Sequence, residues 1–172
     1  GANKPENCHF KRPGPFPSIV TAQADADLNN FVDVLKHEGV KVYRPQRHRF
    51  VPNGMYNYCP RDRLLIIGDT VIDCNMQYPC REEEIQYLPI PQDVNVLRVP
   101  RDQGIFFDAA NVCRLNNTLL YLKSPSANQE GADWLQQQFP NHNVETTETY
   151  SGIHIDSTFV PVQNGLVLVN KD

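Results

Sequence analysis

Apolar positions recur along the chain with two different periods, and each period predicts one class of secondary structure. Helical spacing marks two segments: Leu28, Phe31, Val32 and Leu35 define a helix over 27–38, and residues 128–139 carry a second. Short apolar runs predict strands at 40–43, 63–67, 71–73, 94–99, 111–115, 118–122, 143–147, 158–162 and 166–169. The Pro-rich stretch of the first twenty or so residues is predicted to be irregular. Helices and strands that alternate in this way indicate an α/β fold.

Three strand pairs are predicted to form hairpins, because a two-residue turn separates the strands of each pair. The turns Gly68-Asp69, Asn116-Asn117 and Asn164-Gly165 begin at residues 68, 116 and 164, a constant spacing of 48. Asn-Gly is expected to form a type I′ turn, with positive φ at both residues. A helix and a strand follow the second hairpin, whereas the helix after the first is weak. The pattern predicts a repeated ββαβ unit.

The points within the repeat at which the chain begins and ends bear on its domain organisation. The chain begins on a helix and a strand and ends on a bare hairpin, an arrangement that would leave sheet edges unpaired. Residues 1–172 are therefore expected to be an internal segment of a larger fold, truncated at both ends. The remainder would come from further sequence or from another chain.

The composition argues against some classes of binding partner. The 172 residues are 40% apolar and 21% charged, with a formal net charge of −4. The negative balance and the lack of a basic stripe argue against a nucleic-acid partner. No apolar run reaches the roughly 20 residues of a membrane span, and no signal peptide is visible. Five cysteines without a C-x-x-C pair fit a reducing compartment, so a cytoplasmic location is expected.

Three aspartates precede the three turns at similar distances. Asp62 lies six residues before the first turn, and Asp108 and Asp156 lie eight residues before the second and the third. His154 lies two residues before Asp156, so an extended backbone would point both side chains to one face. The repeat predicts that these groups meet at one end of the fold, where clustered carboxylates would require a cation.

Two kinds of cation suit such a cluster. Mg²⁺ or Ca²⁺ would take oxygen ligands, and a guanidinium would take planar, bidentate carboxylate partners. Separate strand ends supply carboxylates but little local backbone for a metal, so a guanidinium is favoured. The simpler alternative is that the three aspartates are turn and cap residues.

Three motifs resemble those of the amidinotransferase family: PRDRLLIIGDTVID at 60–73, FDAANVCR at 107–114 and HIDSTFVPVQNGLVLVN at 154–170. The likeness spans roughly residues 20–170, in the family's order. The resemblance implies the pentein-type α/β propeller of five ββαβ units, of which about three would be present. On this basis residues 1–172 form one partial amidinotransferase-like pentein domain.

The resemblance also implies a chemistry: transfer of the amidino group of arginine to an acceptor amine through a cysteine-bound amidino intermediate. His154 would be the general acid and base, and Asp108 would support the catalytic centre and hold the guanidinium. Asp62, Asp156 and Arg81 would bind substrate. No metal, nucleotide or flavin is implied as a cofactor, and arginine and an acceptor amine are the implied partners. A homodimer is a further option.

Several positions depart from the family pattern. Pro79 replaces the first arginine of the family's M-x-x-R-S-R segment, and Asn111 replaces the second aspartate of F-D-A-A-D. The nucleophilic cysteine of the family would lie beyond Asp172, outside this chain, and Cys113 is expected to be a packing residue. Two alternatives stay open: a guanidine hydrolase or deiminase, in which water replaces the acceptor amine, and a non-catalytic arginine-binding protein.

Overall fold

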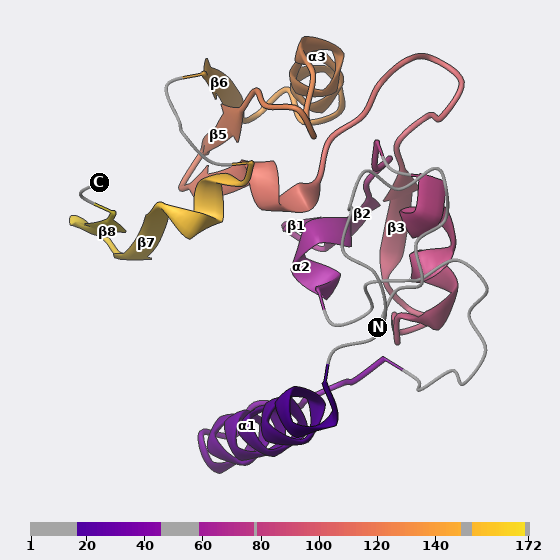
Figure 1. Cartoon of the computed structure of the whole chain (residues 1–172). Coiled ribbons are helices and arrows are strands. Elements are labelled where there is room, and N and C mark those ends of the chain that lie inside the picture. Colours follow the sequence, from indigo (N-terminus) through magenta and orange to yellow (C-terminus); the bar gives the residue numbers. More distant parts are fainter. Residues whose placement is uncertain (1–16, 46–58, 78, 149–152, 171–172) are drawn as a thin grey trace. The chain divides into compact units, whose positions relative to one another are not determined.

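The computed structural model describes residues 17–45, 59–77, 79–148 and 153–170 (Figure 1). The chain divides into two compact units. The helical unit comprises Gly1–Tyr58 and Tyr78–Ile90, and the sheet unit comprises Cys59–Gln77 and Pro91–Asp172. Among the described residues no helix is long and apolar enough to cross a membrane.

The helical unit contains the long helix α1, Ser18–His37, and the 3₁₀ helix η1, Pro79–Tyr87. α1 begins at Ser18 rather than at residue 27, because residues 18–26 contain neither Pro nor Gly and include good helix formers. The prediction of irregular structure was therefore wrong for these residues. α1 ends where expected, since Gly39 adopts a φ of +77° and the Val40 N–H donates to Leu35 O at 2.9 Å.

The strand predicted at 40–43 does not form. Residues 40–45 have no regular secondary structure, and Val40 and Tyr43 are 46% and 50% exposed. A strand needs a neighbour that satisfies its backbone N–H and C=O groups. No strand within the described ranges pairs with this segment.

The sheet unit contains three hairpins, two of which are extended by a third strand. The strands are β1 (Leu64–Ile67), β2 (Thr70–Asp73), β3 (Asn95–Arg98), β4 (Val112–Leu115), β5 (Thr118–Leu122), β6 (Asn143–Thr147), β7 (Phe159–Gln163) and β8 (Leu166–Val169). β1 pairs antiparallel with β2, which pairs parallel with β3, and β4, β5 and β6 repeat this order and these directions. Helix α3, Gln129–Gln138, joins β5 to β6 and packs against β6 (Figure 1). Along the chain, the segment between β2 and β3 forms the 3₁₀ helix η1 and no α-helix, in line with the weak helical pattern there.

The three turns need residues that tolerate positive φ. Gly68 and Asn116 have φ of +61° and +53°. The type I′ prediction for the third turn was wrong, because Gly165 has a φ of +80° whereas Asn164 does not have a positive φ. A register shift between Pro161 and Gln163 lies directly before this turn. Proline cannot donate to the strand ladder, and such an irregularity changes the local twist on which a type I′ turn depends.

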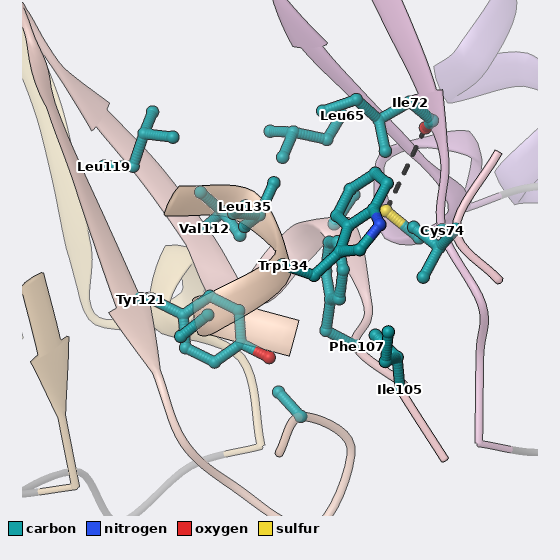
Figure 2. Close-up of a cluster of buried hydrophobic side chains, with 14 of the residues drawn as sticks. Leu65, Ile72, Cys74, Ile105, Phe107, Val112, Leu119, Tyr121, Trp134 and Leu135 are labelled. Carbon is teal, nitrogen blue, oxygen red and sulfur yellow. Dashed lines mark hydrogen bonds between the residues drawn. The ribbon is translucent and has the colours of Figure 1, made fainter. Parts of the chain in front are cut away.

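One apolar core holds the first two sheets and α3 together (Figure 2). Its centre is aromatic: the Phe107 ring lies 5.8 Å from that of Tyr121 and 6.3 Å from that of Trp134, measured between centroids. Leu65 of β1 and Leu135 of α3 belong to the same cluster, so strand faces from successive repeats share one interior. This core includes Ile105, Phe107 and Ala109 of the segment that precedes the second hairpin, whereas Ile155, before the third, packs in a second cluster with Cys113 and Leu122.

Candidate active site

Three short helical turns lead into the three hairpins, and they carry the predicted acidic residues. α2, Pro60–Arg63, precedes β1; η2, Ala109–Asn111, precedes β4; and η3, Ile155–Ser157, precedes β7. Proline at the first position of α2 suits a helix start. α2 contacts η2, and η2 contacts η3. The repeat thus brings three segments that are distant in sequence to one place, as predicted.

His154 lies between two of the aspartates. Its Nε2 is 2.9 Å from Asp108 Oδ2, and its Nδ1 is 3.8 Å from Asp62 Oδ1. The imidazole is 25% exposed, whereas Asp108 is only 3% exposed. An ionised carboxylate can only accept, so Nε2–H donates to Asp108. The ring is therefore oriented by a buried carboxylate and remains open to solvent on one side.

The charges around His154 favour its protonated form. Burial lowers the pKa of the imidazole, but the hydrogen bond to Asp108 and the charges of Asp62, Asp108 and Asp156 outweigh this effect. The net result is a pKa above the ordinary value of 6.5. A histidine of this kind can both donate and accept a proton near neutral pH.

Asp108 keeps one oxygen without a partner. Its Oδ1 is buried and accepts no hydrogen bond from any described residue. The backbone around it is fixed: Asp108 N–H donates to Ser126 O at 3.1 Å, and Asn111 Nδ2 donates to Ser126 Oγ at 2.9 Å. A buried carboxylate oxygen without a donor is costly, so this atom points to a cationic ligand with N–H groups.

Asp156 lies near His154 and Asp62, but its backbone conformation differs from the one predicted. Asp156 lies within η3, so the backbone there is not extended, whereas the period-two alignment with His154 had assumed an extended backbone. Its Oδ2 lies 3.6 Å from Arg61 Nε. Burial raises the pKa of Asp156; Arg61 and His154 lower it, and Asp62 raises it further, so the net shift is upward. Mutual effects on pKa place Asp156 in one electrostatic group with His154 and Asp62.

Comparisons with known proteins agree with this geometry, although no family model matches the chain. The chain is 36% identical to a putative inosamine-phosphate amidinotransferase 2 of Streptomyces griseus over 91% of its length. It is 28% identical, over 92% of its length, to the L-arginine:L-lysine amidinotransferase of Pseudomonas savastanoi pv. phaseolicola. The structure of inosamine-phosphate amidinotransferase StrB1 from Streptomyces griseus matches 91% of the chain with a TM-score of 0.77 at 29% identity, and 55% of StrB1 is covered. Over most of its length the chain is thus similar in sequence and in fold to amidinotransferases.

The chain covers 55% and 56% of the two curated relatives, so it spans a little over half of their length. The α/β class predicted from the sequence is confirmed by the strands, by α3 and by the likeness to StrB1. The three motifs on which the resemblance was based contain α2, η2 and η3.

Arg81, the fifth predicted site residue, belongs to the helical unit. Its guanidinium is buried and binds Glu84 through two bonds, Nε to Oε1 at 2.7 Å and Nη2 to Oε2 at 2.9 Å. Such a bidentate pair holds both side chains rigidly. The role of Arg81 in substrate binding stays a prediction.

Two described cysteines of the sheet unit, Cys74 and Cys113, lie in environments that do not suit a nucleophile. Cys113 is packed with Leu122 and Ile155, as expected, and burial raises the pKa of its thiol. Burial also raises the pKa of the Cys74 thiol well above the ordinary value. The thiolate is the reactive form, so both environments disfavour attack.

The candidate site contains a further charged residue, Arg61, that the sequence reasoning missed. Arg61 faces Asp156 and donates from Nη2 to Val112 O at 2.8 Å. Its position between Pro60 and Asp62, inside a recognised motif, was the available signal. Within the described part of the chain, no three His, Cys, Asp or Glu side chains form a group that could hold a metal ion.

Proposed function

We propose that the protein transfers the amidino group of arginine to an acceptor amine. A cysteine thiolate outside this chain attacks the guanidinium carbon, and the bond from that carbon to the side-chain nitrogen of ornithine breaks. The acceptor amine then attacks the same carbon, and the carbon–sulfur bond breaks. Covalent catalysis of this kind divides one difficult displacement into two easier ones.

In this proposal His154 moves both protons. It donates a proton to the departing ornithine nitrogen and later accepts one from the acceptor amine. Asp108 holds the imidazole through the 2.9 Å bond and offers Oδ1 to a guanidinium N–H. Asp62 and Asp156 bind the other guanidinium nitrogens and fix the plane of the substrate for attack. Arg81 would contribute to the acceptor side.

The unpartnered Oδ1 of Asp108 is the observation that carries the proposal. Among the described residues, the charged groups within ion-pair distance of one another at the site are three carboxylates, one guanidinium, that of Arg61, and one imidazole. A negative charge therefore remains even when His154 is protonated. A planar cation with several N–H donors would satisfy the free oxygen and balance this charge.

The proposal includes the finer architecture. Two three-stranded sheets with the same strand order and a third hairpin recur at a spacing of 48 residues. Such a repeat supports a ring of five ββαβ units, in which about three would belong to this chain.

The test is product analysis on the full-length protein incubated with arginine labelled at the guanidinium carbon. Candidate acceptors are offered one at a time, beginning with lysine, glycine and an amino-cyclitol phosphate. We expect ornithine together with a new labelled guanidino compound. If urea, citrulline or ammonia forms without such a compound, the reaction is hydrolysis and the proposed transfer is wrong. Tight arginine binding without turnover would indicate a sensor.

Matched variants separate the site from the rest of the molecule. Asp62→Asn removes a carboxylate beside His154, whereas Asp69→Asn makes the same change in the exposed turn of the following hairpin. We expect turnover of arginine to fall by about 10²-fold or more for Asp62→Asn and to stay within about twofold for Asp69→Asn. Equal effects of the two variants would contradict the assignment of Asp62.

A further inference from the structure

Arg61 connects three repeats. It belongs to α2 in front of the first hairpin, donates to Val112 O on β4 of the second, and lies 3.6 Å from Asp156 in front of the third. The Arg61 side chain is 46% exposed and that of Asp156 is 37% exposed. Resting on the proposed function, we infer that Arg61 is a positioning residue that orients the Asp156 carboxylate for a guanidinium substrate.

The anchor to β4 gives Arg61 a fixed geometry. A guanidinium presents several N–H donors in a rigid plane, so a bond from Nη2 to a strand carbonyl also sets the position of Nε. The 2.8 Å bond to Val112 O is made by the backbone of β4, which the shared core holds in place. The position of the positive charge beside Asp156 therefore follows from the sheet.

The separation of Arg61 from Asp156 suits a positioning role. At 3.6 Å the two groups attract each other but do not form a short hydrogen bond. The carboxylate can therefore still accept N–H groups from a ligand while its orientation is held. Without Arg61, Asp156 would face other acids and would ionise less readily. The charged and titratable groups on the elements packed around Asp156 are Arg61, Asp62, Asp108, Cys113, Arg114 and His154.

The chain contains an internal control for a purely structural role. Arg114 on β4 donates from Nη1 to Ile66 O on β1 at 2.7 Å, so it also joins two repeats through a backbone carbonyl. Both arginines line one cavity of about 290 Å³ that Asp156 also lines. Among the described residues, however, Arg114 makes no ion pair with Asp156. Both arginines therefore link two repeats through a hydrogen bond to a backbone carbonyl, but only Arg61 also lies beside the Asp156 carboxylate.

The experiment compares Arg61→Gln, Arg61→Lys and Arg114→Gln in the full-length protein, with kcat and KM for arginine measured from pH 6 to 9. Arg61→Gln should raise KM about five- to tenfold, with a smaller change in kcat, and should move the acidic limb of kcat/KM to higher pH. Arg61→Lys should recover most of the affinity, because a cation is restored. Arg114→Gln should change KM by less than about twofold and should shift the pH profile less than Arg61→Gln does, because Arg114 is not among the charges that shift the pKa of Asp156. Its loss of unfolding free energy should be similar to that of Arg61→Gln.

Two results would overturn the inference. Equal kinetic effects of Arg61→Gln and Arg114→Gln would mean that Arg61 acts only as a cross-link. A lower KM in Arg61→Gln would mean that Arg61 competes with the substrate for Asp156. Wild-type protein that neither binds nor converts arginine would remove the proposed function and this inference together. Arginine turnover by wild type with unchanged Arg61→Gln kinetics would remove the inference alone.

Discussion

The sharpest test of the His154–Asp108 pair is the pH dependence of stability in Asp108→Asn. The pKa of His154 is raised in the folded protein: burial lowers it, but the Asp108 hydrogen bond and the nearby carboxylate charges outweigh burial. The folded protein therefore binds this proton more tightly than the unfolded chain does. The stabilisation is complete below the unfolded pKa of about 6.5 and is lost as the pH rises through the folded pKa.

The magnitude follows from the geometry. Nε2 and Oδ2 are 2.9 Å apart, and Asp108 is 3% exposed. A hydrogen bond to a charged group contributes about 1.5–3 kcal/mol, and a neutral one about 0.5–1.5 kcal/mol. Asparagine keeps an acceptor oxygen but removes the charge, so we expect Asp108→Asn to lose about 1–2 kcal/mol of unfolding free energy at pH 6. Above the folded pKa of His154 this loss should disappear, because wild type then holds a buried carboxylate beside a neutral ring.

Urea unfolding at pH 6, 7.5 and 9 measures this difference. Trp134 is the sole tryptophan and is 7% exposed in the core of the sheet unit, so its fluorescence reports on the correct part of the chain. Asp73→Asn is the matched control, since Asp73 is also buried but binds Arg63, Nε to Oδ1, at 2.6 Å. Arginine does not titrate in this pH range. The loss of unfolding free energy in Asp73→Asn should therefore be larger, about 3 kcal/mol, and the same at every pH.

A loss in Asp108→Asn that is equal at pH 6 and pH 9 would refute the reasoning. It would show that Asp108 contributes through packing or a neutral hydrogen bond, with no imidazolium as its partner. A loss of unfolding free energy that grows with pH would contradict an upward shift of the His154 pKa.

Two further predictions concern neighbouring positions. Asn111→Asp should raise the pKa of His154, because a second carboxylate enters the turn in which Asn111 N–H donates to Asp108 O; an NMR titration of the imidazole that shows no change would contradict this. Gly131→Ala should destabilise the fold by about 1–3 kcal/mol despite its better helix propensity, because the new Cβ would overlap Tyr121 Oη and lie 2.8 Å from Phe107 Cδ1. Adding Tyr121→Phe to Gly131→Ala should recover part of that loss in urea unfolding, because it removes the hydroxyl that the new Cβ would overlap. If the losses of the two single variants simply add in the double variant, the predicted clash is absent.

The hairpins and α3 could be predicted because their signals are local. Short apolar runs on either side of the turns at Gly68 and Asn116 specify a strand pair without reference to the rest of the chain. Asn128 likewise caps α3 by accepting from Gly131 N–H at 3.1 Å, a contact within one helical turn. The segment 40–43 has a strand composition but needs a partner strand, and composition alone does not supply one.

The site was predictable as a set of residues but not as a geometry. Repeat spacing was enough to bring Asp62 and Asp108 together, because equivalent positions of successive repeats meet at one end. It did not identify Arg61, whose importance depends on a 3.6 Å approach to a residue in another repeat. It also assumed an extended backbone around Asp156, because period-two reasoning cannot detect a single 3₁₀ turn.

The arrangement couples substrate binding to proton transfer. The carboxylates that would bind the guanidinium of arginine are the same ones that raise the pKa of His154. A cation placed on Asp62, Asp108 and Asp156 would neutralise those charges, so the pKa of His154 would fall towards its ordinary value on binding. The imidazole would then release its proton more readily, at the moment when a leaving amine needs one. In the proposed mechanism the surplus of negative charge in the free site would select a cation, and the bound cation would lower the pKa of the acid that acts on it.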